Sequence, residues 1–470
     1  MGMAVRPWYF YRGGRNPVFI ALPGGVVSRD LSALTQIEGS RAFRRRSHSD
    51  TLVKAGLMGV ILSALLAVSR APAEELDTPE TVTPPVSKSS SKSDVPSKPT
   101  PKAAAKPRPT VKVPVKPPPR QIDRIVWQHP RRGRQELEGS TVVEAQDGGL
   151  LLLSRGGQLL PVEAPQLITR EPTGKPFQPH TPAEMTRQLQ AEFGPGFEII
   201  TTKRYLICSN AGRPYSEWCG ALFERLYFAF DNYWRQRGIA LSVPEFPLVA
   251  IIFRDQRQFL TYGVETTGET LQGVTGFYDI RSNRMTMYDL TAGASATDLM
   301  ARIQAAPAQI STIVHEASHQ VSFNTGLQVR LADNPIWLSE GLAMFFETPD
   351  LSSKTGWKTV GAVNELRLRP FRQQLAAGRP KNLLLSLIAT DDRFRDPAEA
   401  GRAYADTWAL NYFLIKMRPK QYVAYLKTIG SKAPLEWDDP QARVAEFKQA
   451  FGDDLDKLET DWLNYLNKLR

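Results

Sequence analysis

The sequence predicts an α+β fold, in which short strands come first and helices follow. Three observations support this prediction. Short apolar or alternating runs bounded by turn residues recur between residues 121 and 290, apolar residues at helical spacing dominate from about residue 307 onward, and a predicted hairpin precedes the most distinctive helix. Such segregation of strands and helices is typical of α+β domains. At 470 residues with 42% hydrophobic composition, the chain is long enough for two or three domains.

Residues 1–73 have the features of a leader with a secretory signal. The apolar run Ala55–Val68 follows Lys54 and precedes an Ala-Pro-Ala sequence at residues 71–73. This run is shorter than the roughly 20 residues of a membrane-spanning helix, so it fits a signal peptide better. We therefore expect an exported protein that is periplasmic or otherwise extracytoplasmic, or one anchored to the membrane by an uncleaved signal.

Residues 74–120 are rich in Pro, Ser, Lys and Thr and contain almost no large apolar side chain. Such a segment cannot bury enough surface to offset its ordering entropy, so we expect a disordered, semi-stiff linker. Residues 1–120 hold 19 Lys+Arg and 8 Asp+Glu, a balance of +11 that equals the formal net charge of the whole chain. Residues 121–470 are therefore neutral overall, and no nucleic-acid-binding face is expected.

Residues 121–172 predict a small β-meander. Three short apolar or alternating runs are separated by turns that contain Gly-Gly, and such turns are typical of hairpins. The runs are Ser140–Ala145, Gly149–Ser154 and Gln158–Val162. The segment contains no residue pattern typical of a catalytic or metal site.

Residues 173–470 form the predicted main domain. A long helix with apolar residues at helical spacing is expected between two strands, and a hairpin follows them. The ranges are Phe197–Cys208 and Phe246–Phe253 for the strands, Pro214–Arg237 for the helix, and Gly276–Ile280 with Arg284–Leu290 for the hairpin. The two cysteines, Cys208 and Cys219, permit one disulfide in an oxidising compartment, and a pair of small buried hydrophobes is an equal alternative.

The most distinctive segment is a helix expected over Ile310–Phe323, which reads ISTIVHEASHQVSF. His315 and His319 lie four residues apart, so both imidazoles project from one side of the helix and can reach one metal ion. Glu316 lies about 100° around the helix from His315, which is the position of the general base in H-E-x-x-H metallohydrolases. The alternative, a chance pairing of ordinary helix histidines, is weakened because the chain has five histidines in all.

Catalytic zinc normally has three protein ligands, and Glu340 is the candidate for the third. It lies 21 residues after His319, in a helix expected to begin at Asn334-Pro335 and to end before Thr348-Pro349. Gly341 follows it, and the missing side chain is expected to let this helix approach the histidine helix closely. The alternative is an ordinary solvated helix carboxylate, which is the commoner fate of glutamate.

The HEASH and WLSEGLAMFFE segments together resemble the gluzincins, the zinc peptidases whose third ligand is the Glu of an E-G-x-A helix. The chain is most similar to an uncharacterised exported bacterial family with a peptidase MA-like domain. The resemblance implies a zincin-like domain, in which a small mixed or antiparallel sheet precedes a helical bundle, and one zinc ion per chain. His315, His319 and Glu340 would be the ligands and Glu316 the base.

The specific match covers residues 310–347, and the sequence departs from the family in two places. It has GVTGFYDI where aminopeptidases carry a G-A-M-E-N-like motif, so the resemblance does not extend to aminopeptidase activity. The position four residues after Glu340, where a carboxylate that supports a metal ligand is usual, holds no acidic residue. Glu347, seven residues after Glu340, could face the same side of the helix.

Related peptidases stabilise the oxyanion with a downstream Tyr or His. Tyr404, in the helix expected over Arg402–Met417, resembles that tyrosine, and no histidine follows His319. The alternative is a core role in which Tyr404 packs against Trp408 four residues later. Tyr412 is the next candidate donor on the same helix.

The predicted function is hydrolysis of peptide bonds in a peptide or protein substrate, with Glu316 taking a proton from zinc-activated water. The hairpin strand Arg284–Leu290 is expected to be the sheet edge to which an extended peptide pairs. Two alternatives are an inert, envelope-tethered binding or structural module that retains the fold, and an amidase that acts on cell-wall peptides. Glu316 argues against the inert module, because holding a metal ion requires the ligands alone.

Overall fold

The computed structural model describes residues 120–130, 133–268, 271, 273–293, 298–348, 350–351, 353, 357–378 and 380–469, and the backbone of residues 60–62. The predicted leader, apart from those three residues, and the predicted linker up to residue 119 lie outside the described residues. Within the described part of the chain, no helix is both long and apolar enough to cross a membrane.

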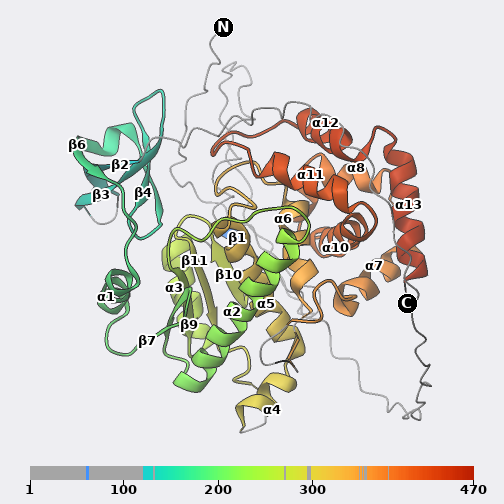
Figure 1. The fold of residues 1–470 in the computed structure, drawn as a ribbon, viewed down its shortest axis with the longest axis horizontal. Helices are drawn as coiled ribbons and strands as arrows, with labels where there is room; N and C mark the ends of the chain where they lie inside the picture. The colour runs from blue at the N-terminus through green and yellow to red at the C-terminus, as the bar shows by residue number, and fades with distance from the viewer. Residues whose placement is uncertain are drawn as a thin grey trace, which may run out of the picture. The chain divides into compact units, whose positions relative to one another are not determined.

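The larger of two sheets is mixed and six-stranded, in the order β1-β10-β11-β9-β8-β7. Strand β9 runs parallel to its neighbours β11 and β8, and the other neighbouring strands are antiparallel. The strands are β1 (Val60–Leu62), β7 (Glu198–Thr201), β8 (Tyr205–Ser209), β9 (Leu248–Phe253), β10 (Gly276–Asp279) and β11 (Arg284–Tyr288). Figure 1 shows this sheet beside the long helices α2 (Arg213–Arg235) and α5 (Pro307–Asn324).

The structure confirms the strand near Phe246–Phe253 and the hairpin, but it corrects two expectations. The segment Phe197–Cys208 forms two strands, because Thr202 and Tyr205 close a tight turn between them: Thr202 N–H donates to the Tyr205 carbonyl at 2.9 Å, and Tyr205 N–H donates to Thr202 Oγ1 at 3.0 Å. The predicted edge strand, β11, lies inside the sheet between β10 and β9. The outer side of β10 pairs with β1.

The two cysteines lie on opposite faces of the main sheet, because successive residues of β8 point to alternate faces. Ile207 packs into the core that α2 covers, and Cys219 of α2 belongs to the same core. Cys208 packs on the other face, with residues of α1 (Pro182–Phe193) and α3 (Gln256–Thr267). Both thiols are buried and free. The structure therefore favours two small buried hydrophobes over a disulfide.

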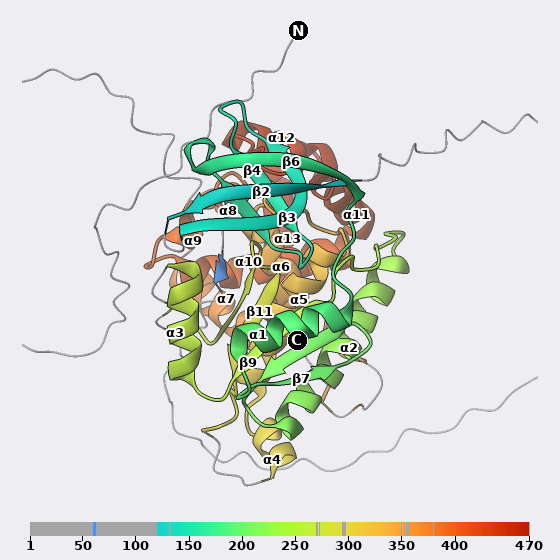
Figure 2. The same ribbon diagram turned by 90° about the vertical axis from the view of Figure 1, so that its left-hand side faces the viewer.

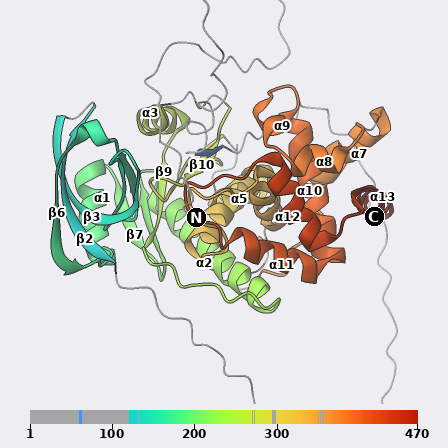
Figure 3. The same ribbon diagram turned by 90° about the horizontal axis from the view of Figure 1, so that it is seen from above.

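The chain after the sheet is mainly helical, as predicted. Figure 3 shows α5 between the strands of the main sheet and the C-terminal helices. The helices are α4 (Leu299–Gln304), α5, α6 (Ile336–Phe346), α7 (Glu365–Ala377), α8 (Leu383–Ile388), α9 (Asp392–Arg395), α10 (Ala400–Met417), α11 (Pro419–Ile429), α12 (Pro440–Phe451) and α13 (Leu455–Lys468). This order of a mixed sheet followed by helices confirms the α+β class.

Helix α5 is buried on all sides from Ile310 to Phe323. The apolar stripe predicts one buried face correctly, but the opposite face meets protein instead of solvent. Gln320 on that face donates hydrogen bonds to the carbonyls of Val249 at 2.9 Å and Asn283 at 3.2 Å in the main sheet. The polar residues of α5 are therefore interior groups that need protein partners.

The smaller sheet is antiparallel and five-stranded, in the order β5-β4-β3-β2-β6. Figure 2 shows its strands β2, β3, β4 and β6. Its elements are β2 (Gln121–His129), β3 (Gly133–Glu144), β4 (Leu150–Ser154), β5 (Leu159–Val162), the short helix η1 (Ala164–Gln166) and β6 (Leu167–Pro176). The predicted meander is present, but β2 and β6 add two strands and extend it to residue 176. Strand β6 reads LITREPTGKP and is mostly exposed, so it lacks the alternation that marks a strand.

Candidate metal centre

Helices α5 and α6 bring the three predicted metal ligands together. His315 and His319 project from one side of α5, and their Nε2 atoms lie 3.1 Å apart. From α6, Glu340 Oε2 lies 3.1 Å from His315 Nε2, and Glu340 Oε1 lies 3.7 Å from His319 Nε2. All three side chains are buried. This group could hold a metal ion.

The spacing of the donor atoms fits a tetrahedral metal site. Ligand atoms about 2.0–2.1 Å from a tetrahedral zinc ion lie roughly 3.3 Å from one another. His315 Nε2 lies 3.1 Å from both His319 Nε2 and Glu340 Oε2, and the 3.7 Å contact to His319 Nε2 is made by the other carboxylate oxygen, Oε1. Two imidazole nitrogens and a carboxylate oxygen are also a donor set that zinc accepts. The ligand types therefore fit zinc, and the two 3.1 Å distances from His315 Nε2 are close to the tetrahedral spacing.

The electrostatics of the buried groups favour a bound cation. Burial lowers the pKa of His315, but the carboxylates of Glu340 and Glu347 outweigh burial and raise this pKa to about 10. Burial raises the pKa of Glu340, yet His319 and His315 hold it at about 2. Glu316 adds another buried carboxyl group. Such a concentration of buried carboxyl groups is costly unless a cation balances it, and a divalent metal ion would do so.

Glu347 contacts the Nδ1 atom of His315, whereas the other two predicted ligands lie near its Nε2 atom. Its Oε1 lies 2.6 Å from His315 Nδ1. A hydrogen bond from Nδ1–H to this carboxylate would fix the tautomer whose Nε2 lone pair can bind a metal. Burial raises the pKa of Glu347, but the guanidinium of Arg367 and the His315 ring hold it at about 2, so the carboxylate stays ionised. The expectation that Glu347 faces the same site is confirmed.

Helix α7 completes this support. Arg367 donates two hydrogen bonds to the Glu347 carboxylate, from Nη2 to Oε1 at 2.8 Å and from Nε to Oε2 at 3.0 Å. Asn364 Nδ2 donates to Oε2 at 2.8 Å, while its own Oδ1 accepts from the Leu366 N–H and caps α7. The start of α7 therefore fixes the carboxylate that orients His315.

Glu347→Gln should weaken metal binding although it removes no ligand. The neutral amide is a poorer acceptor for His315 Nδ1–H, and loss of such a supporting partner costs about 10- to 100-fold in metal affinity. Competition against a chromophoric zinc chelator would measure this change. Wild-type affinity in the variant would exclude a supporting role for Glu347.

A second variant separates metal support from folding stability. Glu347→Gln also leaves the Arg367 guanidinium without its buried carboxylate, and breaking a buried pair on one side is destabilising. Glu347→Gln combined with Arg367→Met removes both charges. We expect the double variant to recover much of the free energy of unfolding, measured in urea, while its zinc affinity stays low.

Glu316 is fully buried on α5, and strand β10 orients it. Its Oε2 accepts a hydrogen bond from the backbone N–H of Tyr278 at 2.9 Å. The Tyr278 ring stacks on Phe323 of α5 with a centroid distance of 5.7 Å, and its hydroxyl donates to Asn283 Oδ1 at 2.7 Å. Tyr278 is thus fixed at both its ring and its hydroxyl, so its N–H holds the Glu316 carboxylate in one orientation.

Gly341 permits a close helix contact, but with a helix other than the one predicted. A Cβ at this position would overlap the side-chain amide of Asn411 on α10. That amide donates to the Trp337 carbonyl at 2.9 Å and accepts from the Tyr422 hydroxyl at 2.6 Å. The absence of a side chain at Gly341 therefore lets α6 pack closely against α10, while the side chain of Glu340, one residue earlier, extends toward α5.

Gly341→Ala should destabilise the fold by about 2–6 kcal/mol, because overpacking and the disturbed buried hydrogen bonds of Asn411 each cost about 1–3 kcal/mol. Urea denaturation would measure the loss. Asn411→Ala removes the atoms that the new Cβ would meet, so the double variant should lose less stability than the two single losses added together. Additive losses would show that Asn411 is not the obstacle.

The start of α6 is fixed by a distant carboxylate. The helix begins at Ile336, two residues after the predicted cap, and Asn334 instead donates to nearby loop carbonyls. The Ile336 N–H donates to Asp391 Oδ1 at 3.0 Å, and Asp391 also pairs with Arg443 at 3.0 Å. This pairing links the helix that carries Glu340 to α12.

Tyr404 lies near the candidate centre, on α10. Burial raises the pKa of its hydroxyl well above the usual value, and the other charges that shift it are those of Glu340, Arg367, Glu316 and Glu347. Its ring contacts Phe394, with centroids 5.7 Å apart, whereas Trp408 packs against Tyr412 at 5.1 Å. Tyr404 also packs against the core cluster that contains Trp408, so its ring keeps the predicted core contact beside the candidate role. The pKa of Tyr412 is raised by burial and by Tyr465, and not by the charged groups of the candidate centre. Tyr404 is therefore the better candidate for the oxyanion donor.

Sequence reasoning missed Arg367 and Tyr278. Arg367 lies on an ordinary polar helix, and Tyr278 acts through a backbone N–H that carries no residue-specific signal. Asn364 offers one usable signal, because Asn directly before a helix is typical of an N-cap.

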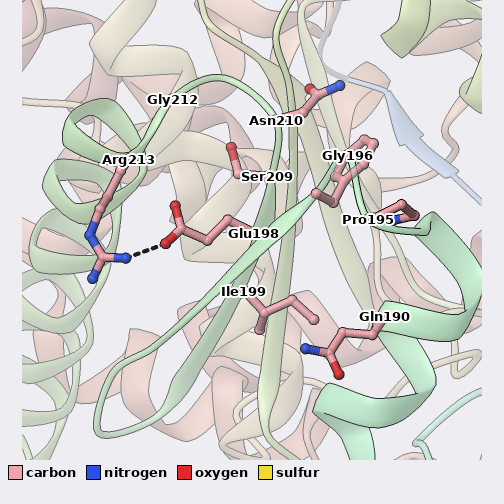
Figure 4. Close-up of a pocket in the computed structure, with 10 residues that line it drawn as sticks. Gln190, Pro195, Gly196, Glu198, Ile199, Ser209, Asn210, Gly212 and Arg213 are labelled. Atoms are coloured by element: carbon pink, nitrogen blue, oxygen red, sulfur yellow. Dashed lines mark hydrogen bonds and ion pairs between the residues drawn. The ribbon is translucent and has the colours of Figure 1, made fainter.

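A polar hollow of about 550 Å³ lies elsewhere, at the end of α1, β7 and the start of α2 (Figure 4). Glu198 and Arg213 form an ion pair beside it. Two further polar side chains of the hollow have partners: Ser209 accepts from Ser216 at 2.7 Å, and Asn210 donates to Gln258 at 2.7 Å. None of the predicted site residues lines it, so it is separate from the candidate metal centre.

Comparison with known families gives a match to the second half of the chain. The family described as "Protein of unknown function (DUF1570)" matches residues 309–436, about a quarter of the chain. All five predicted site residues lie within this match: His315, Glu316, His319, Glu340 and Tyr404. No curated protein matches the chain. The match is consistent with the predicted similarity to an uncharacterised family, and it carries no statement of activity.

Proposed function

We propose that the protein is a zinc-dependent peptidase of the gluzincin type. His315, His319 and Glu340 would bind one zinc ion per chain, and Glu316 would be the general base. The observation that carries this proposal is the convergence of three buried donor residues, whose ligand atoms lie within 4.8 Å of one another, with a buried glutamate next to His315 in α5. A site that only held a metal ion would not need Glu316.

The residues of the site suit this chemistry. Zinc, when bound, would supply a Lewis acid that lowers the pKa of water and polarises the substrate carbonyl. Glu316 would accept the proton of the attacking water and pass it to the leaving amine. Tyr404 would donate a hydrogen bond to the oxyanion, and its raised pKa keeps its hydroxyl protonated at neutral pH.

An extended peptide substrate would pair with β10 rather than with β11. Strand β11 is internal, whereas the outer side of β10 pairs in antiparallel register with the three residues of β1. Because the Tyr278 N–H in β10 donates to Glu316, a peptide in the place of β1 would lie along the strand that contacts the base. The leader sequence further suggests that the protein acts outside the cytoplasm.

Metal analysis and a peptide-library digest of the purified protein test the proposal. We expect about one zinc ion per chain and peptide cleavage that a chelator abolishes and added zinc restores. His315→Ala and His319→Ala should each lose most of the zinc, and wild-type zinc content in either would end the ligand assignment. Cleavage confined to cell-wall peptides would indicate an amidase, and zinc binding without hydrolysis would indicate an inert module.

A further inference from the structure

The small β2–β6 sheet contacts the β10–β11 hairpin directly. The Leu159 N–H at the start of β5 donates to the carbonyl of Arg281, in the hairpin turn, at 2.7 Å. Beside this bond, Leu151, Leu153 and Leu159 share a buried apolar cluster with Phe246 of the main domain. The sheet is therefore attached to the main domain by apolar packing as well as by a backbone hydrogen bond.

Arg330, in the segment between α5 and α6, joins the same two parts. Its Nη1 donates to the Gly157 carbonyl, in the β4–β5 turn, at 2.8 Å and to the Ile280 carbonyl, at the end of β10, at 3.2 Å. One guanidinium nitrogen thus bridges the small sheet and the hairpin. Burial lowers the pKa of Arg330, and a buried cation keeps its place only when its donors are satisfied.

The hairpin carries this attachment to Glu316. Ile280 and Arg281 follow Tyr278 by two and three residues, and the Tyr278 N–H donates to Glu316 Oε2 at 2.9 Å. The Asn283 side chain closes the hairpin against Tyr278 and also bonds to Asn324 at the end of α5, at 2.7–2.8 Å. Because this hairpin is short and internally bonded, a shift at its turn would move the Tyr278 N–H.

We infer that Arg330 and the small sheet position Glu316, by fixing the β10–β11 hairpin whose Tyr278 N–H orients its carboxylate. The small sheet then contributes to catalysis by holding the β10–β11 hairpin in place, although its sequence contains no site motif. This inference rests on the proposed role of Glu316 as general base. Arg330 is a positioning residue, because it acts through the hairpin and not on the substrate.

Arg330→Met tests the inference, because methionine keeps an apolar stem of similar length but removes both hydrogen bonds. We expect kcat to fall about 10- to 100-fold, as small displacements of a catalytic group do, with KM and zinc content close to wild type. Peptides that contain the Tyr278 amide should exchange hydrogen faster, as followed by mass spectrometry. Arg330→Lys, which retains a donor, should recover part of the turnover.

Arg155→Met is the matched control. Arg155 also joins the β4–β5 turn to the main domain, through the Gln178 carbonyl at 3.0 Å and Glu184 at 3.1 Å, but it does not touch the hairpin. This variant should keep both turnover and Tyr278 protection. Equal effects in the two variants, or wild-type kcat and exchange in Arg330→Met, would overturn the inference.

Two further outcomes are distinguishable. If Arg330→Met does not fold, Leu159→Pro makes a second test, because proline at the first residue of a strand is tolerated and lacks the N–H that donates to the Arg281 carbonyl. Leu159→Ala keeps this N–H and controls for the loss of the buried leucine side chain. Unchanged kcat and exchange in Leu159→Pro would also overturn the inference. If the wild-type protein hydrolyses no peptide, the proposed function fails. The positioning of Glu316 would still be supported if the Tyr278 amide exchanged hydrogen faster in Arg330→Met but not in Arg155→Met.

Discussion

Glu316→Gln should lose nearly all hydrolysis while it retains the metal and the fold. Glutamine has almost the same shape, and its amide oxygen can still accept the Tyr278 N–H that now lies 2.9 Å from Oε2. It cannot take up a proton at neutral pH, and general acid–base groups contribute at least about 10²-fold to turnover. We therefore expect kcat to fall by at least that factor, measured on any peptide that the wild-type protein cleaves in a zinc-dependent manner.

Glu265→Gln provides a control for the loss of one carboxylate. Glu265 is exposed on α3, so its replacement should change neither turnover nor zinc content. Zinc content in Glu316→Gln should also equal that of the wild type, because Glu316 is not a proposed ligand. Wild-type turnover in Glu316→Gln would mean that another residue is the base.

Elements with a strong local signal could be predicted from the sequence. The apolar periodicity of α2 and α5 and the turn between β10 and β11 each lie within a short stretch. The division between β7 and β8 could not be predicted, because the Thr202–Tyr205 turn contains neither Gly nor Pro. The parallel placement of β9 between β8 and β11 depends on long connections, and no local pattern indicates which strands such a connection brings together.

The same distinction applies to the candidate site. His315, Glu316 and His319 were predictable because one helical turn sets their spacing. Glu340 could be named only as a candidate third ligand beside the alternative of a solvated carboxylate, because its contact with His315 joins two helices. Arg367 could not be predicted, because it reaches the site through Glu347 and a third helix.

Gly341 shows a limit of a different kind. The glycine after the predicted ligand Glu340 correctly indicated a close helix contact, but the partner helix was predicted wrongly. The helix that fills the space is α10, which lies about 70 residues further along the chain. Local chemistry can thus indicate that a close contact exists without naming the partner.

Tyr404→Phe should lower kcat by about 10²–10³-fold, the loss typical when one donor to an oxyanion is removed. Phenylalanine keeps the ring that packs against Phe394 but lacks the hydroxyl. Because that hydroxyl is proposed to bond most strongly in the transition state, kcat should fall more than KM rises. Steady-state kinetics, zinc analysis and urea denaturation of the same preparation would show whether turnover alone is affected.

Tyr412→Phe is the matched control for this test. Tyr412 lies on the same helix, two turns later, and packs among Trp408, Phe345 and Tyr465. Loss of its hydroxyl should leave kcat unchanged, because the ring packs among these core aromatic side chains. If Tyr404→Phe kept full turnover and Tyr412→Phe lost it, the oxyanion donor would be Tyr412. Equal turnover in both variants and the wild type would instead leave zinc to stabilise the oxyanion without a tyrosine on α10.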